Sequence, residues 1–282
     1  MNTTDCVNSR GCERCNEQGG DKNVGCYAPP KPPKARQILF NTEMVNAILG
    51  GRKTQTRRPV KPQPHQHHWE ILRGYKRDIR LMDTSGGLYA KFTYSISRGT
   101  IKDRESVWAK SPFGKPGDLL YVREKFCVGA VVCAEGNEWF IEQGEGQNNT
   151  IPYEVAISED FGIEGVIWKP SIFMLRKDSR LTLKVKRVWV ERVQNIDELR
   201  ALNEGIKELS NCSPPNYSKT EKQYMGGDCV GFKTAKDAFS YLWDSIYNQQ
   251  KDIRKNFPWE SNPWVWACEF SVIKKNVDEI LK

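Results

Sequence analysis

The chain has 282 residues, of which 38% are hydrophobic and 28% charged, an ordinary composition for a soluble globular protein. No apolar run reaches the roughly 18 residues that a membrane-spanning helix needs, and the N-terminus lacks the charged and apolar regions of a signal peptide. We therefore expect a cytoplasmic protein with no membrane partner. The net charge of +8 favours a polyanionic partner, although solubility alone explains it equally well.

Four of the nine cysteines lie in the first 26 residues. An odd total without an export signal favours reduced thiols over disulfides. Cys12 and Cys15, with two residues between them, present two thiolates to one metal ion, and Cys6 and Cys26 complete a tetrahedral set. We predict a structural zinc site there; the alternative is a chance accumulation of cysteines near a terminus. Residues 1–36 read as an appendage that ends in a stiff proline-rich linker.

Short elements follow one another through the first half of the body. They are a strand at residues 37–40, a helix capped by Thr42 and ended by Gly50, a strand at 88–94, a turn at 111–118 and a buried strand at 119–122. The rest of residues 59–115 shows no clear period.

The second half is also rich in predicted strands. In chain order it predicts strands at 130–132, 138–141, 165–168 and 181–193, a helix from 197 to about 209, a polar surface excursion at 210–228, a helix capped by Thr234, and a strand at 264–270. Trp243 lies on the apolar stripe of its helix and should pack in the core. Trp264 and Trp266 share one face of their strand, so one of them should be buried. Many strands with three short helices predict a barrel decorated by helices.

A basic segment follows the first helix. It reads Gly51-Arg52-Lys53-Thr54-Gln55-Thr56-Arg57-Arg58. Glycine lets a ligand approach the backbone, and arginine offers a planar fork of donors to a phosphate. The residue types fit a phosphate-binding loop and a solvated charged turn about equally well, and they lack the glycine spacing of a Walker loop.

The same segment resembles the opening signature of ASCH-domain proteins, most closely the long versions common in bacteriophage and prophage genomes. Further blocks follow in the family's order: residues 114–124, 168–174, 179–183, 203–206, 242–246 and 262–266. The resemblance implies an α+β, mainly β chain with a PUA-like, partly open β-barrel, flanking helices and inserted loops. This domain would span residues 37–275, with insertions near 59–115 and 130–165 and a tail at 276–282.

The resemblance also implies a function. We expect a cleft that binds nucleic acid, RNA rather than DNA, or a modified nucleotide. Some short bacterial members are amidohydrolases that remove the acetyl group from N(4)-acetylcytidine, and the motif positions correspond to Lys53, Thr56 and Glu204. The alternative function is therefore a hydrolase that acts on an acylated cytidine or on RNA phosphodiesters. In this alternative a desolvated Lys53 is the base, Thr56 the nucleophile and Glu204 the assisting acid or base.

Two other interpretations stay open at this point. Lys53 would bind a phosphate, Thr56 would pack and Glu204 would pair with an arginine in a protein that only binds. A phage accessory or assembly protein that uses the barrel for protein contacts is the third hypothesis.

Several further side chains are predicted to contact nucleic acid or substrate. Aromatic faces stack on bases, and arginines along one track hold phosphates, although rim ion pairs and loop charges explain the polar members too. The predicted binding residues are Arg52, Arg57, Arg58, Tyr121, Arg123, Glu124, Trp168 and Arg180.

Overall fold

The computed structural model describes residues 32–64, 77–98, 101–133, 139–142, 149–153, 155, 166–209, 223–225, 231–248 and 257–282. The chain divides by its internal contacts into Met1–Pro33 and Lys34–Lys282, and every helix and strand named below belongs to the second unit. The predicted boundary after residue 36 lies close to this division. The four cysteines proposed as zinc ligands lie outside the described residues.

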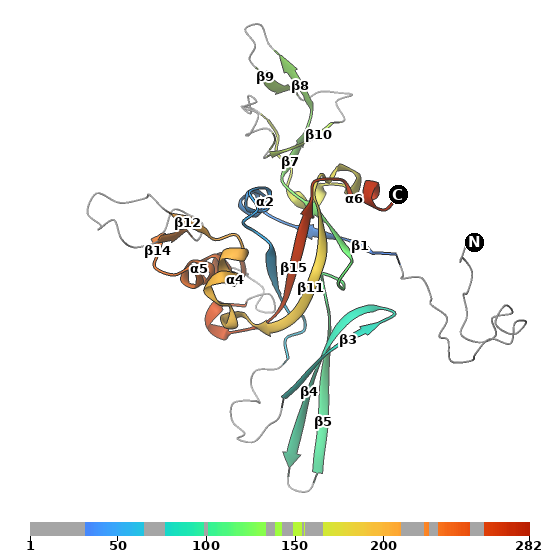
Figure 1. The fold of residues 1–282 in the computed structure, drawn as a ribbon, viewed down its shortest axis with the longest axis vertical. Helices are drawn as coiled ribbons and strands as arrows, with labels where there is room; N and C mark the ends of the chain where they lie inside the picture. Colours follow the sequence, from blue (N-terminus) through green and yellow to red (C-terminus); the bar gives the residue numbers. More distant parts are fainter. Residues whose placement is uncertain are drawn as a thin grey trace, which may run out of the picture. The chain divides into compact units, whose positions relative to one another are not determined.

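A five-stranded sheet forms the centre of the second unit (Figure 1). In spatial order its strands are β1 (Ala35–Leu39), β6 (Leu119–Arg123), β11 (Thr182–Arg192), β15 (Trp264–Ile273) and β2 (Gln55–Pro59). β1 and β6 are parallel, and the other neighbours are antiparallel. β1 and β2 form the two edges, so the sheet is open among the described residues. The structure confirms the predicted α+β, mainly β class.

Short helices accompany the sheet. Those with described bounds are α2 (Thr42–Leu49), α4 (Glu198–Asn203), α5 (Ala235–Tyr247) and α6 (Val277–Ile280). Thr234 caps α5 as predicted, and Gly50 ends α2 as predicted. The predicted cap at Thr42 is one residue late, because the Asn41 side chain accepts the hydrogen bond from the Met44 amide. Among the described residues, no helix is both long and apolar enough to cross a bilayer.

The helix predicted from residue 197 to about 209 is wrong in its second half. α4 ends at Asn203, and Gly205 adopts a φ of +102°, which favours glycine. The Gly205 amide donates to the Leu202 carbonyl at 2.8 Å, as at many helix ends. Residues Lys207–Leu209 then form the short strand β12.

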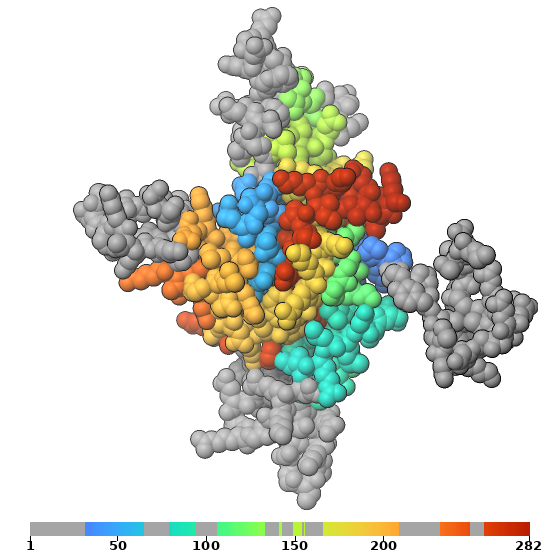
Figure 2. Space-filling model, in the orientation of Figure 1, coloured from blue at the N-terminus to red at the C-terminus, as the bar shows by residue number. Residues whose placement is uncertain are grey.

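The two faces of the sheet contribute to different hydrophobic cores. Trp266 and Phe270 of β15 join the larger core, which includes residues of α2, β6 and β11. Val265, on the opposite face of β15, packs with α4 and α5, where Trp243 is buried as predicted. Trp266 is buried and Trp264 half-buried, as expected for a pair of which one is core. On the face seen in Figure 2, the blue α2–β2 segment lies among the yellow-orange and red segments.

The structure confirms three strands predicted in the insertions. They are the strand at 88–94, which is part of β4 (Gly87–Arg98), the strand at 130–132, which is part of β8 (Ala130–Cys133), and the described part of the strand at 138–141, which belongs to β9 (Trp139–Glu142). The sequence pattern did not reveal β3 (Arg77–Thr84) and β5 (Ile101–Lys110), which pair with β4, or β10 (Thr150–Pro152), which pairs with β7 (Phe126–Val128). The strand predicted at 165–168 is wrong for its described part, since residues 166–168 belong to no strand. Within the excursion predicted at 210–228, β13 (Gln223–Met225) pairs with β12 and with β14 (Gly231–Phe232).

Candidate functional site

The basic segment is a tight turn followed by a buried edge strand, not one loop. Gly51 has a φ of +74°, and β2 begins at Gln55 and pairs with β15. All but one residue of β2 are buried. The loop predicted over residues 51–58 is therefore wrong from Gln55 onward. The buried strand could not be predicted from its sequence, because basic residues indicate an exposed segment unless acidic partners neutralise them.

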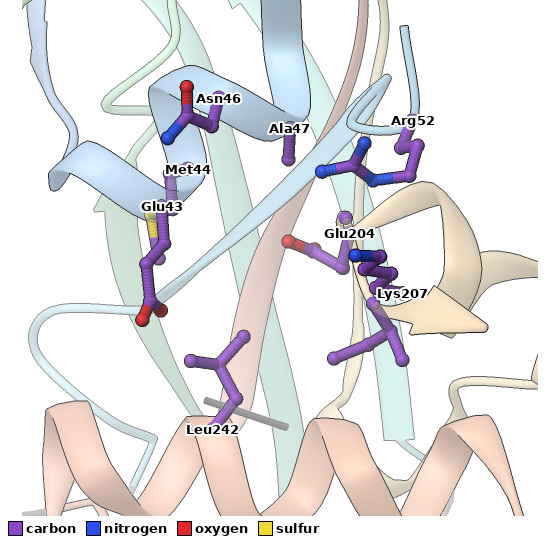
Figure 3. Close-up of a pocket in the computed structure, with 10 residues that line it drawn as sticks. Glu43, Met44, Asn46, Ala47, Arg52, Glu204, Lys207 and Leu242 are labelled. Atoms are coloured by element: carbon purple, nitrogen blue, oxygen red, sulfur yellow. The ribbon is translucent and has the colours of Figure 1, made fainter. Parts of the chain in front are cut away.

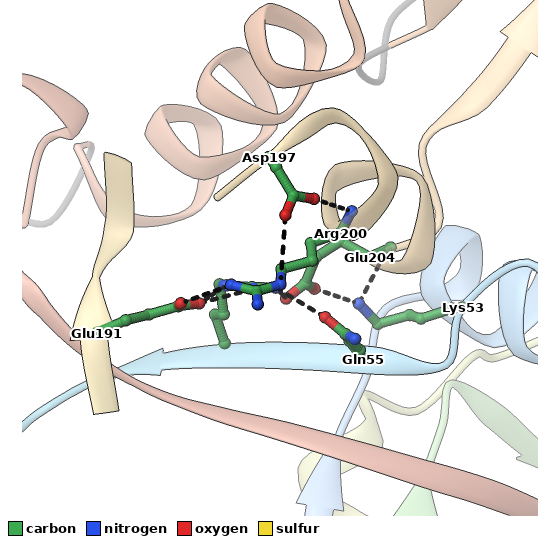
Figure 4. A network of polar contacts seen from close by, with 7 residues as sticks. Lys53, Gln55, Glu191, Asp197, Arg200 and Glu204 are labelled. Carbon is green, nitrogen blue, oxygen red and sulfur yellow. Dashed lines mark hydrogen bonds and ion pairs between the residues drawn. The ribbon is translucent and has the colours of Figure 1, made fainter. Parts of the chain in front are cut away.

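Lys53 and Glu204 meet at the end of this turn, although 151 residues separate them (Figure 4). The Lys53 Nζ atom donates to the Glu204 Oε2 atom at 2.7 Å and to the Glu204 carbonyl oxygen, also at 2.7 Å. The two backbones form a β-bridge, and the Thr54 amide donates to the Asn203 carbonyl at 2.8 Å. The side chains are 1% and 5% exposed, so this ion pair is a buried one.

Arg57 holds the other oxygen of the same carboxylate. Its Nη1 atom donates to Glu204 Oε1 at 2.9 Å, and its Nε and Nη2 atoms donate to Glu191 Oε1 at 2.9 and 2.7 Å. Arg200 reaches Glu191 Oε2 at 3.2 Å from α4. Arg57 is 2% exposed, and its donors serve these carboxylates and, at 3.5 Å, the Gln55 side chain, so the structure gives Arg57 an internal positioning role.

The charges inside this network are balanced. In its buried part, Lys53 and Arg57 bring two positive charges, and Glu191 and Glu204 bring two negative ones. Arg200, which is more exposed, pairs with Asp197 as well as with Glu191. Burial lowers the pKa of the Lys53 ammonium from its ordinary value of 10.5, and the Glu204 carboxylate opposes that shift. Such a cluster persists only if each charge keeps its partners, because an unpaired buried charge is costly.

A pocket of about 340 Å³ opens beside Glu204 (Figure 3). α2, the Arg52 turn, the start of β12 and α5 surround it. Arg52 and Lys207 line one side and Glu43 lines another, while Glu204 is the buried carboxylate among the lining residues. The rest of the lining is mainly apolar or small, consisting of Met44, Asn46, Ala47, Gly205, Ile206 and Leu242.

Thr56 is buried on β2 opposite Cys268 of β15. Arg57, the next residue of the strand, points into the ion-pair network, and successive strand side chains face opposite ways. Among the residues that the structure describes, no hydrogen bond joins Thr56 to Lys53 or Glu204. The structure thus brings together two of the three residues of the expected catalytic set.

Arg58 ties the two edges of the sheet together. Its Nη2 atom donates to the Leu39 carbonyl at the end of β1 at 3.0 Å, and its Nη1 atom donates to the Tyr247 hydroxyl at 3.3 Å. A side chain, in place of a backbone ladder, therefore links β2 to β1.

None of the other predicted binding residues lines the pocket beside Glu204. Arg180 and Glu124 form a bidentate ion pair with two contacts of 2.9 Å. Arg123 donates to the Gln37 side chain and to the Ile172 carbonyl, so it is not the partner of Glu124. The remaining two predicted residues, Tyr121 and Trp168, contact neighbouring side chains. The Arg176 guanidinium lies over the Tyr121 ring, and Trp168 packs edge-on against Tyr153.

Sequence reasoning missed Glu191, Glu43 and Lys207. Glu191 carried a weak signal, because it is the single acidic residue in the strand predicted over 181–193. Glu43 and Lys207 carried none, because a charge on a short element says nothing about the pocket that it faces.

Metal binding at the N-terminal cysteines stays a prediction, since those residues are not described. Within the described part of the chain, Cys127 and Cys268 are buried free thiols, and no three His, Cys, Asp or Glu side chains cluster as metal ligands would.

The chain was also compared with known proteins. No protein-family model, curated protein or solved structure matches it.

Proposed function

We propose that the pocket beside Glu204 binds a nucleotide, either within RNA or as a modified nucleoside. The observation that carries the proposal is a buried, doubly paired carboxylate in a pocket whose exposed lining residues include Arg52 and Lys207. The resemblance of residues 51–58 to the ASCH signature points to the same turn, and it implies a PUA-like barrel around it.

Each part of the pocket suits a part of such a ligand. Arg52 and Lys207 are donors for a phosphate, and Met44 and Leu242 offer apolar surface to a base. Both oxygens of Glu204 already accept one hydrogen bond, but each keeps a lone pair for a further donor. The exocyclic amino group of cytosine is a natural donor to a carboxylate.

Arg52→Ala should weaken the binding of a fluorescently labelled single-stranded RNA about tenfold, since a charge-assisted contact to phosphate is lost. Fluorescence anisotropy over a series of salt concentrations measures this, and the affinity should fall as salt rises. Lys184→Ala is the matched control, because Lys184 is an exposed lysine of β11 that does not line the pocket. Equal loss in both variants, or binding that ignores salt, contradicts the proposal and favours a protein-contact role.

An amidohydrolase acting on N(4)-acetylcytidine is the second candidate. It is supported by the lowered pKa of Lys53 and by the 2.7 Å contact of Lys53 with Glu204, since a buried amine that sheds its proton can serve as a base. It ranks second because Thr56, the expected nucleophile, has no described hydrogen bond to that pair.

If the chain is such an enzyme, acetate release should rise with pH through the lowered pKa of Lys53, because only the neutral amine accepts a proton. Lys53→Ala and Thr56→Ala should each reduce the rate at least about a hundredfold, and Thr56→Ser should retain activity. Thermal unfolding of each variant separates lost chemistry from lost folding. No acetate release from nucleoside or RNA by the wild-type chain ends this candidate.

A further inference from the structure

A second surface, outside the pocket beside Glu204, exposes apolar side chains on the segment that follows Trp168. Ile172, Phe173 and Leu175 are 59%, 63% and 56% exposed. Phe173 and Leu175 help to line a groove of about 830 Å³, together with residues of β7 and β10. Exposed apolar side chains that lie close together along one segment mark an interaction site more often than scattered ones do.

The segment that carries these side chains is firmly held. Met174, between them, is fully buried. Two short 3-10 helices, η1 (Ser171–Phe173) and η2 (Arg176–Asp178), shape the segment. The Asn276 side chain donates to the carbonyl oxygens of Arg176, Lys177 and Ser179 at 3.0, 3.0 and 2.7 Å. The backbone that carries the apolar side chains is therefore held in place, which reduces the backbone entropy lost on binding.

The groove has a positive rim. Lys169 and Lys177 are exposed lining residues, and Asp178 is the one acidic residue of the lining. No ion pair involves either lysine among the described residues, whereas the nearby Arg176 and Arg180 are paired with Asp278 and Glu124. The net charge of the lining favours a partner that brings carboxylates.

We propose that this groove docks an acidic segment of a partner protein that inserts apolar side chains between its own carboxylates. Two of the three exposed apolar residues are aliphatic and offer no face on which a base stacks. The Trp168 ring, which also lines the groove, already packs against Tyr153 and lies 5.4 Å from the Lys125 ammonium. Apolar anchors with a complementary charged rim are the ordinary composition of a protein interface. The inference does not depend on the nucleotide pocket.

The test uses the full chain as bait for a displayed library of random peptides, with a variant that carries Phe173→Ser and Leu175→Ser as the counter-selection. Both side chains are more than half exposed, so the variant should fold, and its thermal unfolding verifies this. The peptides that survive should combine aspartate or glutamate with leucine, phenylalanine or tryptophan. In addition, Lys177→Glu should weaken their binding about tenfold, with Lys184→Glu as the matched control.

Three results would overturn the inference. They are the absence of peptides that prefer the wild-type chain, surviving peptides without acidic residues, and equal effects of Lys177→Glu and Lys184→Glu. A labelled single-stranded RNA serves as a second probe. If its binding, and not that of peptides, is lost in the double variant, the groove is a nucleic-acid surface and the peptide proposal falls.

Discussion

Glu204→Ala should lower the free energy of unfolding by about 3–5 kcal/mol, the usual cost of removing one partner from a buried ion pair. Its carboxylate, 5% exposed, takes a hydrogen bond on Oε2 from Lys53 and on Oε1 from Arg57. Without it, Lys53 keeps only the Glu204 backbone carbonyl as an acceptor. Arg57 still keeps Glu191. The loss of stability should therefore arise mainly from the Lys53 ammonium, which stays buried without a carboxylate partner.

Denaturant unfolding, followed by tryptophan fluorescence, measures this loss. Glu279→Ala is the matched control, because Glu279 is an exposed residue of α6 and should change stability by less than about 0.5 kcal/mol. Glu204→Gln should fall between the two, since the amide oxygen still accepts one hydrogen bond but the negative charge is gone. A Glu204→Ala variant as stable as the control would mean that water reaches the pair and that the network is not a buried one.

The general class of the fold could be predicted from the sequence, because β11 begins with apolar residues that alternate with lysines and β15 begins with a short apolar run. β2 was not, since its burial depends on Glu191 and Glu204, which come from distant parts of the chain to neutralise Arg57. Local patterns cannot report such a pairing. The same limit explains β3 and β5, whose polar strands are stabilised by pairing with β4.

Part of the candidate site was also predicted, but on a different basis from the fold class. Lys53 and Glu204 were named together through the order of motifs, not through any local property, and the structure places them in contact. Their neighbours Arg52 and Arg57 had equal standing in the sequence, yet one lines the pocket and the other is buried in the network. Arg52 stays in the turn, whereas Arg57 lies on β2, where the alternation of side chains directs it into the network. This difference can be predicted only once the start of the strand is known.

Gly205→Ala should cost about 2–4 kcal/mol, from two separate causes. The φ of +102° is a conformation that alanine adopts only with strain. A methyl group there would also lie 2.9 Å from the Ala47 Cβ atom and 3.3 Å from the Lys53 Cβ atom. The substitution would press α2 and the Lys53 turn away from Glu204, so it should weaken the proposed RNA binding as well as folding.

Gly117→Ala isolates the first cause. Gly117 has a similar φ of +93°, but nothing lies within 4 Å of the added methyl group, so only the backbone strain of about 1–2 kcal/mol is expected. The second cause is tested by combining Gly205→Ala with Ala47→Gly, which removes the methyl group that Gly205→Ala would strike. If steric contact contributes, the double variant is more stable than the sum of the two single effects allows. If Gly205→Ala costs no more than Gly117→Ala, close packing at this point does not hold the Lys53 turn in place.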